Sequence, residues 1–351
     1  MILPDLSNEL LLMVAANLQS LADVYALAQT TTSICNLLIP YLYQVDAKRP
    51  QSKALFWAAK YGGEITFQKA LQAGANPVTE NKSRQTPLHL AAHYGHEGVA
   101  RPLLAIPAVN PDCKDSYGRT PLMEAARHGH VTIMKLLLAA EGVNPETLDK
   151  REMSPLAFAV ARNHEEAVSL LLAIPDLNVR STDYDGYTPL SHAMESAGEA
   201  VVKLIIAREE FDPIWPDFSN DQTALSFAAK KGNAAAVRVL LAADVDPDPK
   251  DRQGLTPLAL AAHGGFPEVV KLLLAADGVD PNACDEMGNT PLSWAEDMNN
   301  IAVVHVLLDH FKKTGIPPKR AETQEWAEDD EEGREFDEYE DYLSDLSGYG
   351  S

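Results

Sequence analysis

The stretch TPLHLAAHYGH, residues 86–96, contains the signals that begin and end a short helix. Thr86 is a favourable N-cap, because its hydroxyl can accept a hydrogen bond from a free backbone N–H of the first turn. Pro87 suits the first helical position, since it has no N–H to leave unpaired. Gly95 then provides the left-handed conformation that ends many helices. The stretch therefore predicts one sharply bounded helix, with Leu88 facing a core.

The same pattern recurs along the chain at intervals of 33 to 35 residues. An aliphatic pair follows each Thr or Ser at a fixed distance, which predicts a second short helix in every copy. A period of this size is typical of arrays in which each unit buries its apolar face against its neighbours. The copies begin at Gln85, Arg119, Met153, Tyr187, Gln222, Leu255 and Asn289, and a weaker first copy begins at Lys53.

Polar segments connect one copy to the next, and each contains an Asp at the same place. Asp in such a position accepts hydrogen bonds from backbone N–H groups further along the chain and so forms a tight turn. The connections are therefore predicted to protrude as hairpins. The aspartates are Asp115, Asp149, Asp183, Asp217, Asp251 and Asp285.

This arrangement resembles the ankyrin repeat over roughly residues 52–312. The resemblance implies an all-α solenoid of about eight repeats, each a helix-turn-helix unit with a protruding hairpin loop. It also implies that the chain binds other proteins.

Residues 1–46 do not follow the repeat, and their pattern predicts three short apolar helices, the last interrupted at Pro40. The segment resembles the F-box in Leu3-Pro4, in Glu9 before LLLMVAANL, in LADVYALAQT and in LLIPYLYQVD. The resemblance implies binding to the adaptor subunit of SCF cullin-RING ubiquitin ligases, and hence a substrate receptor. The alternative is a helical cap on an ankyrin scaffold or sequestering protein. The expected adaptor-binding residues are Leu3, Pro4, Leu6, Leu10 and Val14.

A target protein is expected on the hairpins and on the positions that follow the alanine pair of each first helix. These positions carry basic and aromatic side chains, and aromatic residues and Arg are enriched in protein interfaces. The alternative is that the long cationic side chains only solvate the surface. The predicted target-binding residues are Tyr94, Tyr117, Arg119, Arg127, Lys150, Arg151, Arg162, Tyr184, Tyr187, Phe218, Lys230, Lys231 and Arg252.

The formal net charge of −22 at pH 7 argues against nucleic acid or an anionic membrane as the main partner. Much of the acidity lies in residues 319–351, which are predicted to be a disordered acidic tail. Its composition complements the basic surface, so the tail could fold back and compete with targets; a purely solubilising tail is the alternative.

The composition also bears on cellular location. The chain has only three cysteines, widely spaced, and no Lys or Arg before Lys48, so neither a disulfide framework nor a targeting peptide is expected. We expect a cytoplasmic or nuclear monomer.

No pattern of catalytic residues occurs in the chain. His89 and His93 have the spacing of metal ligands on a helix, but Leu90 stands where a zinc peptidase requires Glu. Phosphate-binding glycine loops and nucleophile motifs do not occur either. The sequence thus predicts no enzyme, no cofactor and no metal.

Overall fold

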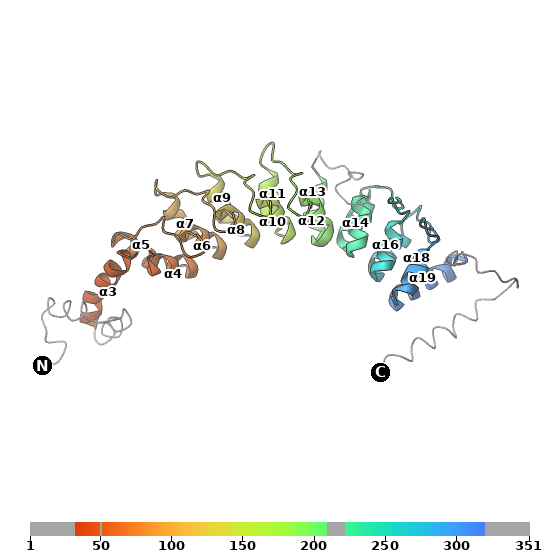
Figure 1. Cartoon of the computed structure of the whole chain (residues 1–351), viewed down its shortest axis with the longest axis horizontal. Helices are drawn as coiled ribbons and strands as arrows, with labels where there is room; N and C mark the ends of the chain where they lie inside the picture. The colour runs from red at the N-terminus through yellow and green to blue at the C-terminus, as the bar shows by residue number, and fades with distance from the viewer. Residues whose placement is uncertain (1–31, 50, 209–221, 320–351) are drawn as a thin grey trace.

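The computed structural model describes residues 32–49, 51–208 and 222–319 of the chain. All regular secondary structure in these ranges is α-helical, and the helices stack into a curved array (Figure 1). The all-α solenoid expected from the repeat pattern is therefore confirmed. Residues 1–31, which hold the first two expected helices and the five predicted adaptor-binding residues, lie outside the described part of the chain.

Each repeat contributes two antiparallel helices, and the first helices line the concave edge of the array in Figure 1. These first helices are α4 (Lys53–Tyr61), α6 (Pro87–Tyr94), α8 (Pro121–His128), α10 (Pro155–Ala161), α12 (Pro189–Ser196), α14 (Ala224–Lys231), α16 (Pro257–Gly264) and α18 (Pro291–Asp297). The second helices are α5 (Glu64–Gln72), α7 (Glu97–Leu104), α9 (Val131–Leu138), α11 (Glu165–Leu172), α13 (Glu199–Ile206), α15 (Ala234–Ala242), α17 (Pro267–Leu274) and α19 (Ile301–Thr314).

The first helices begin at the expected caps. The Thr120 hydroxyl accepts a hydrogen bond from the Met123 N–H at 3.3 Å, and the equivalent bond forms at Ser154, Thr188, Thr223, Thr256 and Thr290. At Thr86 the N–H donates to Nδ1 of His89 at 3.1 Å, and the Thr86 hydroxyl lies 3.0 Å from the same nitrogen. Left-handed residues end most of these helices: Gly95, Gly129, Asn163, Gly232, Gly265 and Asn299.

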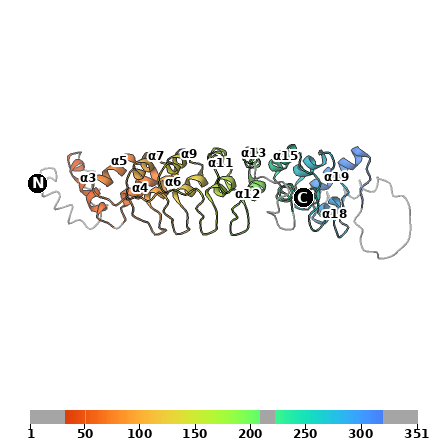
Figure 2. The same cartoon turned by 90° about the horizontal axis from the view of Figure 1, so that it is seen from above.

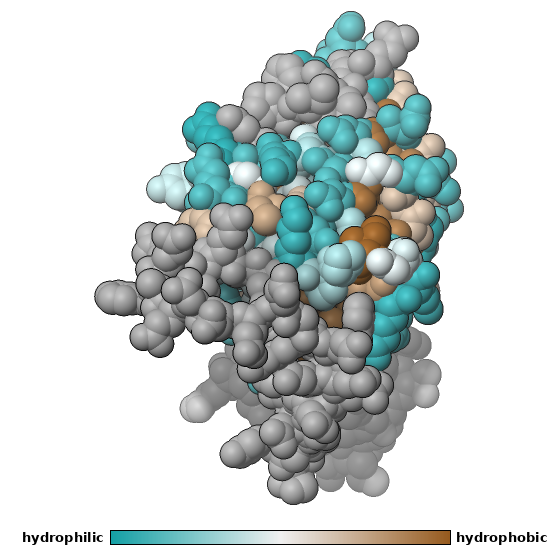
Figure 3. Space-filling model, turned by 90° about the vertical axis from the view of Figure 1, so that its right-hand side faces the viewer, coloured by the Kyte–Doolittle hydropathy of each residue, from teal (hydrophilic) through white to brown (hydrophobic). Residues whose placement is uncertain are grey.

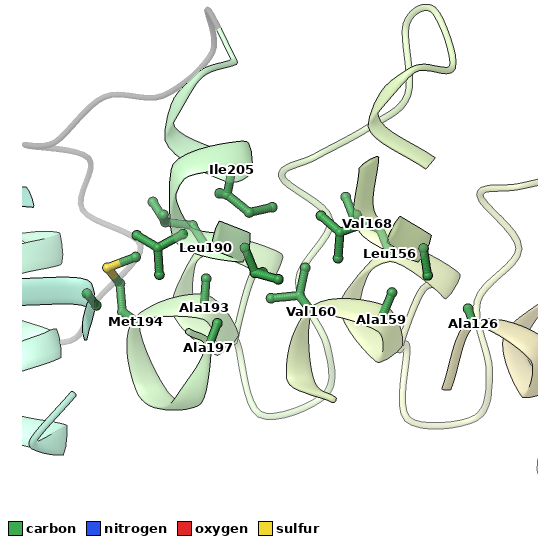
Figure 4. Close-up of a cluster of buried hydrophobic side chains, with 14 of the residues drawn as sticks. Ala126, Leu156, Ala159, Val160, Val168, Leu190, Ala193, Met194, Ala197 and Ile205 are labelled. Atoms are coloured by element: carbon green, nitrogen blue, oxygen red, sulfur yellow. The ribbon is translucent and has the colours of Figure 1, made fainter. Parts of the chain in front are cut away.

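A continuous apolar core runs between the two layers of helices. Figure 4 shows Val160 of α10, Val168 of α11 and Leu190 of α12 converging from two successive repeats. The alanines Ala159 and Ala193 are fully buried beside them, and their small side chains let helices approach closely. An interior repeat thus buries apolar surface on both sides, which is how a unit of two short helices becomes stable.

A histidine hydrogen bond joins the ends of three first helices to the following repeats. The Nε2 atom of His164 hydrogen bonds to the carbonyl oxygen of Arg127 at 3.0 Å, and His130 and His96 make the same bond one and two repeats earlier, respectively. The His164 ring lies directly against Gly129, where an added Cβ would be 2.7 Å from Nδ1. Glycine is therefore required there both for its positive φ and for the space that the next repeat occupies.

Within the described residues, which exclude the predicted hairpin at Asp217, the connections form the predicted hairpins and project in a row along one edge of the array (Figure 2). Oδ1 of Asp115 accepts hydrogen bonds from the N–H groups of Tyr117 and Arg119, at 2.8 and 2.9 Å. Neighbouring hairpins are joined by a backbone bond, as between the Lys150 N–H and the Tyr117 carbonyl at 2.9 Å. The hairpin edge is thus held together across repeats.

Helix α3 (Thr32–Ala47) packs against α5 and α4 at the N-terminal end of the array. The interruption expected at Pro40 is wrong, because the helix continues through it to Ala47. Asp46 is buried and accepts hydrogen bonds from the Ser52 hydroxyl at 2.7 Å and from the N–H groups of Lys53 and Ala54. A carboxylate at the N-terminus of α4 is stabilised by the helix dipole, so α3 is anchored to the first repeat.

Apolar side chains are partly exposed at the C-terminal end of the array. Figure 3 looks at this side of the molecule, where hydrophobic atoms lie among hydrophilic ones. Met298, Ile301 and Ile316 are 45%, 38% and 39% exposed. Met298 follows α18, Ile301 begins α19, and Ile316 lies just after α19.

We expect Gly129→Ala to destabilise the array more than Gly142→Ala. Both glycines have a positive φ, which costs Ala about 1–2 kcal/mol, but an added Cβ at Gly142 meets nothing within 4 Å. The clash with His164 should add about 1–3 kcal/mol to the Gly129 variant, measured as the free energy of unfolding in urea. Equal losses in the two variants, or an unchanged difference in a His164→Ala background, would contradict the proposed contact.

Candidate functional site

Three successive repeats enclose a hollow of about 820 Å³, here called the groove. One wall consists of the hairpins at residues 115–119, 149–153 and 183–187, and the floor consists of α8, α10 and α12. Its polar and aromatic lining is Tyr117, Arg119, Arg127, Asp149, Lys150, Arg151, Phe158, Arg162, Asp183, Asp185, Tyr187, His192 and Glu195. More than half of the predicted target-binding residues are in this set.

The groove contains basic side chains without an ionic partner. Arg127, Lys150 and Arg162 form no ion pair with any residue in the described ranges. Arg151, by contrast, is 2.9 Å from Asp185. The acidic lining residues Asp149 and Asp183 each commit one carboxylate oxygen to their own hairpin turn. Three cations of the lining thus lack an ion-pair partner, and the carboxylates of Asp149 and Asp183 lie in the same groove.

One end of the groove is closed by a cluster around Tyr187. Lys231 Nζ is 2.8 Å from a carboxylate oxygen of Glu195 and 3.4 Å from the Tyr187 hydroxyl. The hydrogen bond to Glu195 is the main cause of a raised pKa for Lys231. The Tyr187 ring packs edge-on against Phe227, with 5.8 Å between centroids. Tyr187 and Lys231 are thus half-buried and fixed, so they shape the groove more than they offer a free surface.

The remaining predicted residues that the structure describes lie outside the groove lining. The Tyr94 and Tyr184 rings are 41% and 78% exposed. Lys230 lines a second hollow, of about 420 Å³, with His263, Met287 and Trp294. Arg252 is exposed on its hairpin, and Phe218 falls outside the described residues. The predicted target-binding residues are therefore divided between a central groove and separate flanking positions.

A charged cluster beside the groove was missed in the sequence. Glu124 of α8 is buried, yet one of its oxygens is 2.9 Å from Nη1 of Arg119. Arg119 also pairs with Asp115 at 3.3 Å, and its side chain is only 15% exposed. The predicted target-binding Arg119 thus has its charge balanced within the protein. The sequence did contain one signal for this cluster, because Glu124 stands at a helix position where the other repeats have no carboxylate.

Two histidines face the other oxygen of Glu124. Nδ1 of His93, from α6, is 2.8 Å from it, and Nε2 of His128 is 3.8 Å from it. The two imidazole rings are 4.1 Å apart between centroids. Burial, together with the neighbouring His93, lowers the pKa of His128 to about 4, so that this ring is neutral at pH 7.

The histidine pair considered from the sequence does not form. His89 is buried under the Thr86 cap, and its Nε2 hydrogen bonds to the Arg119 carbonyl at 3.0 Å. Burial lowers the pKa of His89 as well. His89 is therefore a structural residue that joins two repeats.

No helix in the described part of the chain combines the length and the apolar character needed to cross a bilayer.

Comparison with known proteins identifies the repeats. A family model described as ankyrin repeats in three copies matches residues 12–112, 55–149, 134–217, 209–285 and 225–317. A bovine relative, Ankyrin repeat domain-containing protein 49 from Bos taurus, is 40% identical over 67 residues. The match covers 18% of this chain and 28% of the relative's length. No F-box domain is detected, and no catalytic family is indicated.

Proposed function

The chain belongs to the ankyrin-repeat family, whose members bind other proteins, and we propose that its groove binds an acidic, aromatic-containing segment of a partner protein. The observation that carries this proposal is the set of three basic side chains, Arg127, Lys150 and Arg162, that face the groove without ionic partners. An acidic segment would supply the missing counter-charges, and Arg in particular can bind a carboxylate through two parallel hydrogen bonds.

The shape of the groove favours a chain segment over a small ligand. Its hairpin wall is built from three repeats, and Tyr117 on that wall is 58% exposed. The Arg119 guanidinium stacks on the Tyr117 ring at 4.6 Å from its centroid, which holds the ring in place. A fixed, exposed Tyr is a suitable anchor for an apolar side chain of a partner, because little side-chain entropy remains to be lost on binding.

The charge of the whole chain favours a short acidic segment over nucleic acid. A net charge of −22 repels a long polyanion. Charges on the surface are screened beyond about 8 Å at physiological salt. A short segment inside the groove would therefore experience mainly the local cations, whereas a long nucleic acid would also approach the acidic remainder of the molecule.

We further propose that the protein is a substrate receptor of an SCF-type ubiquitin ligase in the cytoplasm or nucleus. Residues 1–46 would bind the adaptor through Leu3, Pro4, Leu6, Leu10 and Val14, and the array at 52–312 would hold the target. Its contribution to ubiquitin transfer would be proximity alone. The support is the resemblance of LPDLSNELLLMVAANL and the segments after it to an F-box.

The second candidate is an ankyrin scaffold whose N-terminal helices only cap the solenoid. The contact that favours it is Asp46, which anchors α3 to the start of α4. A capping helix needs such a bond, whereas an independent adaptor-binding module does not.

We also propose that residues 319–351 act as an internal competitor for the groove. This segment is acidic and has aromatic residues between its carboxylates, which is the composition proposed for the partner segment.

The groove is tested with a fluorescent peptide of residues 322–351 and a chain that lacks those residues. We expect saturable binding that weakens as salt rises, and a loss of at least about tenfold in affinity for Arg127→Glu with Arg162→Glu, equivalent to about 1.4 kcal/mol. The control is Lys135→Glu, a charge reversal at an exposed position of α9 outside the groove, which should leave the affinity unchanged. Equal affinities for the two variants would exclude the groove as the acidic site.

The ligase role is tested by capture of adaptor and cullin from cells on the tagged full chain. Wild type should retain both, and Leu3→Asp with Leu10→Asp should retain at least about tenfold less, because a buried charge at an apolar interface is strongly unfavourable. Absence of both partners from the wild-type sample would reject the ligase proposal and leave the scaffold as the remaining candidate.

A further inference from the structure

We propose that His93, Glu124 and His128 form a binding site for a zinc ion between α6 and α8. Their nearest ligand atoms, two imidazole nitrogens and one carboxylate oxygen, all lie within 4.8 Å of one another. This proposal departs from the sequence-based expectation of no metal.

The distances between the ligand atoms suit a zinc ion. Zinc binds imidazole nitrogen and carboxylate oxygen at about 2.0–2.2 Å, so two ligands of a tetrahedral site are about 3.3 Å apart. The Glu124 oxygen is 2.8 Å from Nδ1 of His93 and 3.8 Å from Nε2 of His128. These two distances lie on either side of the required value, and small rotations of the imidazole rings would equalise them.

The backbone already brings the ligands together. Glu124 and His128 are four residues apart on α8, which places them on the same face of the helix. His93 comes from α6, which packs against α8 in the stack. The site therefore needs two neighbouring repeats, and its geometry is fixed by the core that joins them.

The state of His128 is an independent sign of a ligand. Its Nε2 atom is buried and has no hydrogen-bond partner among the residues that the structure describes. A buried nitrogen without a partner is unfavourable. A zinc ion placed between it and Glu124 would accept the lone pair of this nitrogen and so remove the cost.

The surroundings also suit a metal site. Arg119 binds the second oxygen of Glu124 at 2.9 Å, and such outer contacts commonly orient ligating carboxylates. Two imidazoles and one carboxylate favour zinc over calcium or magnesium, which prefer oxygen ligands throughout. The His93 and His128 side chains are 31% and 34% exposed, so a fourth ligand could come from water or from a bound partner.

A second pair of repeats provides a natural control. His263 of α16 occupies the same helix position as His93, seven residues after the capping Thr. In the next repeat, Trp294 stands at the position of Glu124 and Met298 at that of His128. His263 instead packs edge-on against Trp294, with 5.1 Å between ring centroids. Its environment therefore lacks the other two ligands.

The experiment is a zinc chloride titration of the purified full chain after removal of metals with a chelator. Binding is followed by calorimetry, and by the visible absorption of the cobalt form, whose intensity distinguishes tetrahedral from octahedral coordination. We expect one tight site with intense cobalt bands, a loss of at least 10-fold in zinc affinity for His128→Ala, and wild-type affinity for His263→Ala.

Two results would overturn the proposal. The first is the absence of a stoichiometric site in wild type, or weak cobalt bands that indicate octahedral binding by scattered surface carboxylates. The second is equal zinc affinity for His128→Ala and wild type. Far-ultraviolet circular dichroism of each variant would show that the fold is retained, and Glu124→Gln, which nearly preserves side-chain volume, provides a second variant with the same expected loss.

Discussion

The packing of one helix pair against the next is the constraint on which the rest of this structure depends. A pair of helices of about eight residues cannot enclose a core by itself, so each repeat is stable only between neighbours. The contact between repeats includes hydrogen bonds and a close steric fit as well as apolar packing. The His164 ring, for example, fills the space beside Gly129 and hydrogen bonds to the carbonyl oxygen of Arg127, near the end of the first helix of the preceding repeat. Substitution in one repeat therefore affects the next.

Both candidate sites are consequences of this stacking. The groove combines side chains from three hairpins and three first helices, so no single repeat contains it. The cluster of His93, Glu124 and His128 combines two repeats in the same way. Because the hairpins are also joined by backbone hydrogen bonds, the array presents these side chains on a rigid edge of a molecule whose total charge is negative.

Much of the fold was predictable because its signals are local. Thr caps, Pro at the first position and a terminal Gly act within a single turn, so the repeat pattern located the helix pairs correctly. Pro40 was misjudged, because the packing of α3 on α5 and the anchoring bonds of Asp46 are tertiary contacts that the local signal does not contain. The ion pairs of Arg119 with Asp115 and Glu124 were missed for a similar reason. The sequence does not show which charged side chains become neighbours when the repeats stack.

The most direct measurement of the central claim is hydrogen exchange of the full chain with Val160→Ala in α10. This change removes two methyl groups from the core between adjacent repeats and should cost about 1.5–3 kcal/mol. If stability is shared between neighbours, amide exchange should accelerate most in α8, α10 and α12, which form the floor of the groove, and least in α4 and α18. Uniform acceleration along the whole array, or acceleration confined to α10, would contradict the account.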